Sequence, residues 1–280
     1  MCLSEKQVSF ASVDGLVLRG TLVVPGEVVG AVVLVHGGGV TREEGGFFTR
    51  LARGLAEAGL MSLRFDLRAH GESEGRMEEL TLSGAANDVR AASQFVLGEA
   101  GEAGGERVGL IAASFGGGLA VLHAARYPGM VERLALINPL LHYERRFVDQ
   151  KPERWQGGSL SPQAAVELAR DGFLPHSAAV RHGRAMLNEV FHVRPDRLLG
   201  EVRAPTLIVH GTADTFIPLQ WSQEAAPQFG RSGAELVVVE GMQHGVAMPD
   251  DPRYLHPQTR AWQAETIARF AAFFGGRADR

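Results

Sequence analysis

The sequence predicts a protein of the α/β class, with a mostly parallel central sheet, helices on both faces of the sheet and a helical insertion. Short apolar runs, such as residues 60–65, alternate along the chain with longer segments of helical spacing. Strands that are apolar along their whole length are typical of parallel sheets buried on both faces. The alternation stops after residue 139 and resumes after residue 199, which indicates an insertion within one core.

The first half of the chain supplies strands and helices in a regular order. Residues 8–13 and 16–24 are expected to form a hairpin that turns at Asp14-Gly15, a dipeptide favoured in tight turns. Further strands are predicted over residues 31–35, 60–65, 107–112 and 131–137. Helices are predicted over residues 43–58, 82–97 and 115–127.

Residues 140–199 break this pattern, and no strand is expected in them. Amphipathic helical spacing covers residues 162–170 and 178–190, between prolines and glycines. We therefore predict a core of residues 1–139 and 200–280, with residues 140–199 as a helical cap over the C-terminal edge of the sheet. Within the second part of the core, strands are predicted over residues 206–209 and 235–239, and helices over residues 219–229 and 258–274.

Composition and charge exclude several classes of function. The chain has 280 residues, of which 45% are hydrophobic and 21% charged, as is ordinary for a soluble globular protein. Its net charge is -4 and it has no cluster of Lys and Arg, so binding to nucleic acid or to an anionic membrane surface is not expected. No apolar run approaches the roughly 18 residues of a membrane-spanning helix.

The lone cysteine and the start of the chain suggest a compartment. Cys2 has no partner for an intrachain disulfide, so the fold does not depend on an oxidising environment. Residues 1–10 are polar and lack the apolar stretch of a signal peptide. A cytoplasmic location is therefore expected, and the oligomeric state stays open, with a homodimer among the options.

The most informative motif is Ala112-Ala113-Ser114-Phe115-Gly116, where a buried strand runs into a serine and a helix begins at once. A sharp strand-to-helix turn needs small neighbours, and it exposes the serine hydroxyl above the sheet. The usual pattern is G-x-S-x-G, and here alanine replaces the first glycine. Taken alone, the motif also fits a serine that merely caps a helix.

A glycine-rich loop follows an earlier buried strand. Exposed backbone N–H groups of His36-Gly37-Gly38-Gly39 can form an oxyanion hole with the N–H that follows the nucleophile. A phosphate-binding loop would instead continue with Gly-Lys-Ser/Thr, which this chain lacks.

Two later loops supply a carboxylate and an imidazole. Asp214 and His244 each follow an apolar strand, so both lie where the C-terminal ends of parallel strands meet. Separately, an Asp in a loop is usually a turn former and a His in a loop is usually solvated. Together with Ser114 they give the order Ser, Asp, His, which indicates a catalytic triad.

With these motifs the chain resembles the α/β-hydrolase superfamily, and within it the serine aminopeptidase and lysophospholipase-like group that includes cinnamoyl (feruloyl) esterases. The resemblance covers nearly the whole chain. Residues 64–73 are similar to the D-x-R-G-H-G-x-S segment of the group, with Ala69 where glycine is usual, and we interpret them as structural. The resemblance implies that Gly38 and Phe115 donate the N–H groups of the oxyanion hole. It also implies that residues after Asn138-Pro139 correspond to the cap of cinnamoyl esterases.

The expected activity is hydrolysis of a carboxylic ester with a small or medium acyl group, including aromatic ones, through an acyl-enzyme on Ser114. No metal or organic cofactor is expected, and the expected partner is a small-molecule substrate. A thioesterase, an amidase or peptidase, and an acyltransferase would use the same triad, so these alternatives stay open. A non-catalytic ligand-binding protein of the same fold is disfavoured because all three triad residues are present.

Three residues at the start of the cap are candidates for the substrate pocket, namely His142, Tyr143 and Trp155. The alternative is that they pack the cap onto the sheet or lie exposed. His70 and His123 are interpreted as structural.

Overall fold

The computed structural model describes residues 3–276, so Cys2 lies outside the described residues. Its centre is an eight-stranded sheet in the order β1-β2-β4-β3-β5-β6-β11-β12. The pairs β1–β2 and β2–β4 are antiparallel and every other neighbouring pair is parallel. The strands of this sheet are β1 (Ser4–Ala11), β2 (Val17–Val24), β3 (Gly30–Val35), β4 (Leu60–Phe65), β5 (Val108–Ala113), β6 (Val131–Ile137), β11 (Thr206–Gly211) and β12 (Glu235–Val239).

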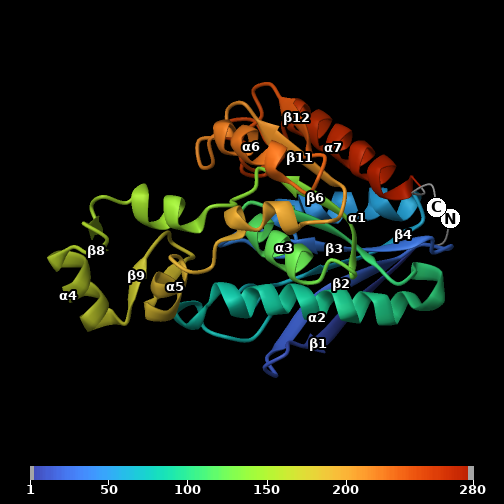
Figure 1. The fold of residues 1–280 in the computed structure, drawn as a ribbon. Helices are drawn as coiled ribbons and strands as arrows, with labels where there is room; N and C mark the ends of the chain where they lie inside the picture. Colours follow the sequence, from blue (N-terminus) through green and yellow to red (C-terminus); the bar gives the residue numbers. More distant parts are fainter. Residues whose placement is uncertain (1–2, 277–280) are drawn as a thin grey trace.

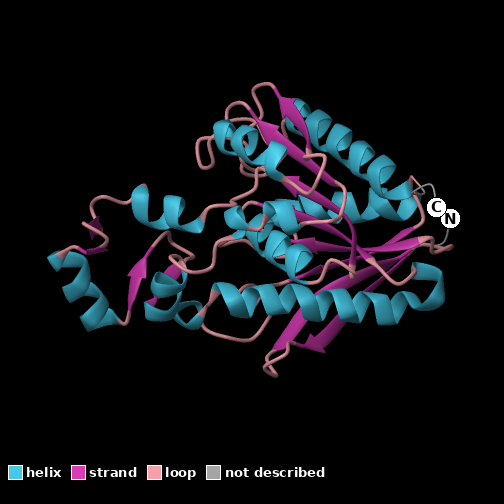
Figure 2. Ribbon diagram, viewed as in Figure 1, coloured by secondary structure: helices cyan, strands magenta, loops and turns pink. Residues whose placement is uncertain are grey.

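Helices cover both faces of the sheet (Figures 1 and 2). One apolar core lies under α1 (Phe47–Glu57) and α7 (Pro257–Gly275). The other lies under α2 (Leu82–Ala100), α3 (Phe115–Arg126) and α6 (Leu219–Ala225). The predicted α/β class, with a mostly parallel sheet between two helical layers, is confirmed.

The central strands follow the predicted runs closely because they are buried on both faces: β4 matches its prediction, whereas β5 ends at Ala113 rather than residue 112, and β11 at Gly211 rather than residue 209. Every residue of β4, β5 and β11 is buried, which explains why their sequences are mostly apolar. Across the described residues, no helix combines the length and the hydropathy that crossing a bilayer requires.

The insertion contains strands, and in this respect the sequence prediction is wrong. Besides α4 (Pro162–Asp171) and α5 (Arg184–Glu189), it holds two short antiparallel ribbons. Strands of two or three residues are too short to show a hydrophobic period. The ribbons are β7 (Trp155–Gln156) with β8 (Ser159–Leu160), and β9 (Phe173–Pro175) with β10 (Arg181–Gly183).

The helix predicted over residues 178–190 is correspondingly shorter. Its first part is β10, because Arg181 and Gly183 pair with Pro175 and Phe173 across the ribbon. Only the part from Arg184 onward is helical. In Figure 1 the ribbons and α4 extend from one end of the sheet, away from α7.

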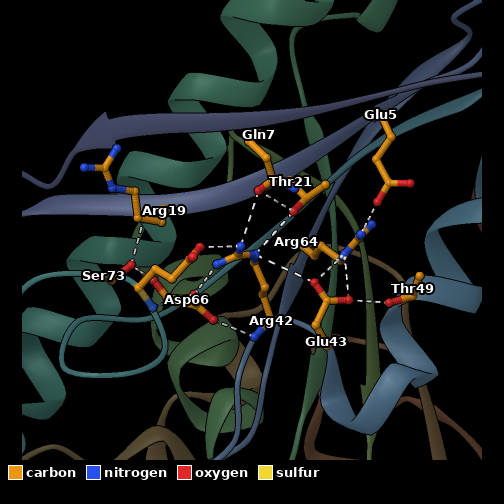
Figure 3. A network of polar contacts seen from close by, with 11 residues as sticks. Glu5, Gln7, Arg19, Thr21, Arg42, Glu43, Thr49, Arg64, Asp66 and Ser73 are labelled. Carbon is orange, nitrogen blue, oxygen red and sulfur yellow. Dashed lines mark hydrogen bonds and ion pairs between the residues drawn. The ribbon is translucent and has the colours of Figure 1, made fainter.

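Residues 64–73 take part in a network of polar contacts beside the loop that follows β3 (Figure 3). The buried Asp66 carboxylate accepts hydrogen bonds from the backbone N–H of Arg42 at 2.7 Å and of Glu72 at 3.0 Å, and it pairs with the Arg42 guanidinium. Ser73 donates its hydroxyl to the Asp66 carbonyl at 2.6 Å. These contacts agree with a structural role for the segment, because they fix the loop after β3 to the end of β4.

Ala69 has a backbone conformation that suits glycine, the residue usual at this position of the related segment. Its φ is +64°, in the left-handed region where a Cβ costs about 1–2 kcal/mol. Replacing it with glycine relieves that strain. The same change raises the conformational entropy of the unfolded chain, which destabilises the folded state by about 0.4–1 kcal/mol. We therefore expect Ala69→Gly to stabilise the protein by about 0.5 kcal/mol, measured as a higher urea midpoint.

The control for this prediction is Ala86→Gly, in the interior of α2, where the conformation is ordinary. That change should destabilise the protein by about 1 kcal/mol. A lower urea midpoint for both variants would mean that the Ala69 turn carries no relievable strain.

Candidate active site

Ser114 lies at the turn between β5 and α3, in a strained conformation with φ +50° and ψ -120°. The turn is held by the Ser114 N–H, which donates to the Ile137 carbonyl at 3.0 Å, and by the Ser114 carbonyl, which accepts from Leu140 at 2.8 Å. The Ser114 hydroxyl makes no capping hydrogen bond to α3. The structure therefore favours a displayed hydroxyl over a helix cap.

Gly116 allows α3 to begin directly against the end of β3. A Cβ at this position would lie 2.6 Å from the His36 carbonyl oxygen and 2.8 Å from that of Val35. Neither backbone atom can move aside, so the position requires glycine. The close approach brings the first turn of α3 beside the glycine loop, where a Cβ on Gly38 would touch the Phe115 side chain at 3.5 Å.

His244 joins Ser114 to Asp214. Its Nε2 lies 2.8 Å from Ser114 Oγ, and its Nδ1 lies 2.7 Å from Asp214 Oδ2. The other carboxylate oxygen, Asp214 Oδ1, accepts the backbone N–H groups of Phe216 at 2.8 Å and Ile217 at 2.9 Å. The Asp214 side chain is fully buried and its orientation is fixed by these two N–H groups, whereas His244 and Ser114 are partly open to solvent. The three residues identified from the sequence thus form one hydrogen-bonded chain.

Asn138, at the end of β6, holds the loops that carry Asp214 and His244 in register. Its side-chain amide donates to the His244 carbonyl at 2.6 Å and its oxygen accepts the Gly211 N–H at 3.0 Å. The residue is fully buried and has φ +41°. Sequence reasoning treated Asn138 only as the border of the cap. The sequence does indicate such a role: an asparagine follows β6, the strand that lies between the strand before Ser114 and the strand before Asp214.

His36 orients the peptide that carries the Gly38 N–H. Its Nε2 accepts the Leu67 N–H at 2.9 Å, so Nδ1 carries the proton and donates to the Gly37 carbonyl at 2.6 Å. In a trans peptide the Gly38 N–H points away from that carbonyl. Within residues 3–276 no acceptor takes the Gly38 N–H, and Gly38 lines the cavity over Ser114. Burial, with a smaller effect of the nearby His70, lowers the pKa of His36 to about 3, which keeps this neutral tautomer.

His70 supports the next peptide of the same loop. Its Nε2 accepts the Gly39 N–H at 3.1 Å while Nδ1 lies 3.0 Å from the Arg68 carbonyl. Burial lowers its pKa, so the ring remains neutral. His70 also lines the cavity over Ser114, so this structural residue is part of the wall of the candidate site.

We expect His36→Phe to lower kcat by about 10- to 100-fold with little change in KM. The ring volume is kept, but the Gly37 carbonyl loses its donor and the Gly38 N–H loses its fixed direction. A single oxyanion-hole donor contributes about 10²- to 10³-fold to kcat, and misalignment removes part of that. Steady-state kinetics on a nitrophenyl ester measures the effect.

The matched control is His123→Phe, because His123 is equally buried, lies in α3 and makes no hydrogen bond from either ring nitrogen within the described chain. It should leave kcat within about 2-fold. Equal losses in the two variants would argue against a specific role for His36.

Glu44 is a second carboxylate at the site, and sequence reasoning missed it. One of its oxygens accepts the Gly37 N–H at 2.5 Å, and its charge interacts with His244. Burial raises the pKa of this carboxyl above its ordinary value, against the smaller opposing effects of the Gly37 N–H and His244. No sequence motif marks Glu44, because its position depends on the turn at Gly45 and Gly46, both with positive φ.

A cavity of about 310 Å³ lies over Ser114. The core supplies Phe115, Ile217 and His244 to its wall, and the insertion supplies Phe147, His176 and His182. Aromatic contacts join the insertion side, where the His182 ring lies 4.8 Å from those of Phe147 and His176. The insertion therefore forms one side of the cavity that Ser114 lines.

None of the three pocket candidates from the sequence is among the residues that line this cavity. Tyr143 is fully buried behind it, where its hydroxyl donates to the Phe115 carbonyl at 2.9 Å. His142 contacts Arg194, with 3.0 Å between Nε2 and Nη2. Trp155 packs edge-on against Phe191 in the insertion. The prediction is corrected: Tyr143 packs the insertion onto the core, whereas His142 and Trp155 make the contacts named here within the insertion.

Comparisons with known proteins agree with this arrangement. The sequence profile of the family described as serine aminopeptidase, S33, matches residues 26–251. A monoacylglycerol lipase of Mycolicibacterium smegmatis is 27% identical, over 92% of this chain and 97% of its own length.

Solved structures share the fold at lower identity. Est1E of Butyrivibrio proteoclasticus, solved with ferulic acid, has a TM-score of 0.72 at 20% identity, with 94% of this chain and 99% of that chain covered. Mouse alpha/beta hydrolase domain-containing protein 10 also has a TM-score of 0.72, at 17% identity, with 96% and 98% covered. The matched profile spans most of the chain, including the segments that carry Ser114, Asp214 and His244. The protein therefore belongs to the serine aminopeptidase S33 family of the α/β-hydrolase superfamily and is an esterase-like serine hydrolase.

Proposed function

We propose that the protein hydrolyses carboxylic esters of small or medium acyl groups, with Ser114 as nucleophile, His244 as general base and Asp214 as the residue that orients His244. The observation that carries the proposal is the hydrogen-bonded chain from Asp214 through His244 to Ser114, which ends in a cavity. The lipase and the ferulic acid complex among the similar proteins support an ester bond as the target.

The reaction proceeds in two acyl transfers. His244 Nε2 takes the Ser114 hydroxyl proton as Oγ attacks the ester carbonyl carbon, and the Gly38 and Phe115 N–H groups hold the resulting oxyanion. The tetrahedral intermediate collapses, the C–O bond to the alcohol breaks, and His244 returns the proton to the leaving oxygen. A water molecule then gives its proton to His244 and attacks the acyl-enzyme, which releases the acid and restores Ser114.

The size and lining of the cavity support an acyl group of limited size. Its volume of about 310 Å³ is at the lower end of the range for small-molecule sites, which is about 300–1,000 Å³. Its wall contains Leu80, Leu140, Val180 and Met186, which suit an aliphatic or aromatic chain. Since Val180 and Met186 belong to residues 140–199, we propose that this insertion acts as a cap that sets acyl specificity.

The test is a spectrophotometric comparison of substrate classes with the purified protein. The panel contains 4-nitrophenyl esters from acetate to palmitate, hydroxycinnamate esters, acyl thioesters and aminoacyl anilides. Ester hydrolysis with an optimum at short or medium chain length is expected, and it should depend on Ser114. A kcat/KM at least 100-fold higher for a thioester or an anilide would reassign the substrate class.

A further inference from the structure

We propose that Arg146 binds an anionic group of the substrate, so that the preferred esters carry a carboxylate in addition to the ester bond. This inference rests on the proposed ester hydrolysis and adds to it the charge of the substrate. It is carried by a guanidinium that lines the cavity over Ser114 and has no carboxylate partner.

Among the described residues, Arg146 has no ion-pair partner. The guanidinium donates one hydrogen bond to the side-chain oxygen of Gln150, at 3.0 Å, and lies 5.8 Å from the centre of the Phe216 ring. No carboxylate oxygen of residues 3–276 lies within 4.0 Å of it. The neighbouring Arg145, in contrast, pairs with Glu224 at 3.1 Å, and Arg194 pairs with Asp196 at 2.9 Å.

The partial burial of Arg146 makes this lack of a partner unusual. Loss of solvent lowers the pKa of the guanidinium, yet an arginine stays charged over the whole physiological range. A half-buried charge without an ion-pair partner has lost hydration that protein groups do not replace. A bound carboxylate would restore the missing interaction through two parallel N–H···O hydrogen bonds.

The rest of the cavity wall, within the described residues, has no carboxylate that would repel an anion. The lining residues, all within the described part of the chain, include four histidines and Arg146 but no Asp or Glu. Burial, followed by the charge of Arg146, lowers the pKa of His176 to about 4, and burial with His176 lowers that of His182 to about 3. Both rings are thus neutral at pH 7, and Arg146 supplies a fixed positive charge.

The anion site and the nucleophile belong to the same cavity. The Phe216 ring, over which Arg146 lies, is 5.2 Å from the His244 ring, and the Asp214 charge acts on Arg146. In a substrate whose carboxylate is bound by Arg146, a short chain would therefore connect that carboxylate to the scissile ester carbonyl. The competing interpretation is that Arg146 only holds Phe216 against His244 through a cation–π contact.

The first experiment compares two esters of one acid. Mono-4-nitrophenyl adipate carries a free carboxylate on the acyl side, and methyl 4-nitrophenyl adipate masks it. We expect the wild type to prefer the anionic ester by at least 10-fold in kcat/KM. Arg146→Gln should lower kcat/KM for that ester by about 10- to 100-fold, mainly through KM, because a charged hydrogen bond is lost. The neutral ester should change by less than about 2-fold.

A matched control and a second pair of esters sharpen the result. Arg145→Gln removes a charge one residue away that is paired and outside the cavity wall, and it should leave both adipates unchanged. The pair 4-acetoxybenzoate and phenyl acetate places the carboxylate on the alcohol side instead. An Arg146-dependent preference in this pair, and none for the adipates, would place the bound anion on the leaving group.

A binding experiment tests the anion site independently of ester hydrolysis. Isothermal titration of Ser114→Ala with monomethyl adipate and with dimethyl adipate should show preference for the anion, which Arg146→Gln in the same background removes. Such binding without ester hydrolysis by the wild type would contradict the proposed function and support the anion site. Equal affinity for both compounds, or equal loss of activity on both esters in Arg146→Gln, would overturn the inference in favour of the Phe216 contact.

Discussion

Replacing Ser114 with alanine is expected to lower kcat by about 10⁴-fold or more and to abolish covalent labelling by a fluorophosphonate. The hydroxyl removed is the one that His244 Nε2 contacts at 2.8 Å. The fold should survive, because the Ser114 hydroxyl makes no capping hydrogen bond to α3. Alanine and serine carry the same Cβ, so the strain at φ +50° is nearly unchanged.

The control for this prediction is Ser83→Ala, an exposed serine near the start of α2. It should leave both labelling and kcat at the level of the wild type. Thermal unfolding of Ser114→Ala within about 2 °C of the wild type would show that the loss is chemical. Labelling that persists in Ser114→Ala would move the nucleophile to another residue.

The predictability of the fold followed the length of its strands. β4, β6 and β12 begin and end at the residues predicted, because each is a run of mostly apolar residues between turn formers. The ribbons of the insertion could not be predicted in this way. β7 and β8 have two residues each, and their pairing depends on the positive φ of Gly157 and Gly158 rather than on any hydrophobic period.

Some residues of the candidate site could likewise be predicted from the sequence, and others could not. Ser114, Asp214 and His244 could be identified because each follows a buried strand, and parallel strands end at one edge of the sheet. Asn138 and Glu44 act through contacts to backbone groups of distant loops, and no spacing in the sequence encodes those contacts. For the pocket, sequence reasoning chose aromatic residues at the start of the insertion.

The cavity wall instead takes Arg146 and Phe147, which follow Tyr143 in the same helical turn, and the Phe147 ring stacks on that of Tyr143. Which residues of this π-helical turn face the cavity depends on how the turn packs on the core. Tyr143 points inward because its hydroxyl finds the Phe115 carbonyl, a partner that becomes apparent only when α3 is in place.

Asp214→Asn is expected to lower kcat by about 10⁴-fold while leaving the fold and KM nearly unchanged. The geometry specifies how the loss arises. Asp214 Oδ1 accepts two backbone N–H groups, so in the variant the amide oxygen must occupy that place. The amide NH₂ then points at His244 Nδ1, which accepts a hydrogen bond only when it is unprotonated. The proton moves to Nε2, and the nitrogen that faces Ser114 Oγ can no longer act as a base.

Steady-state kinetics on a 4-nitrophenyl ester and the rate of fluorophosphonate labelling should fall together, because both need a deprotonated Nε2. Asp149→Asn, an exposed carboxylate of the insertion, serves as the matched control and should be neutral. A kcat within about 10-fold of the wild type in Asp214→Asn would show that another carboxylate orients the imidazole. Glu44 is the candidate for that role, since its charge also acts on His244. In that case Glu44→Gln, rather than Asp214→Asn, would carry the loss of kcat.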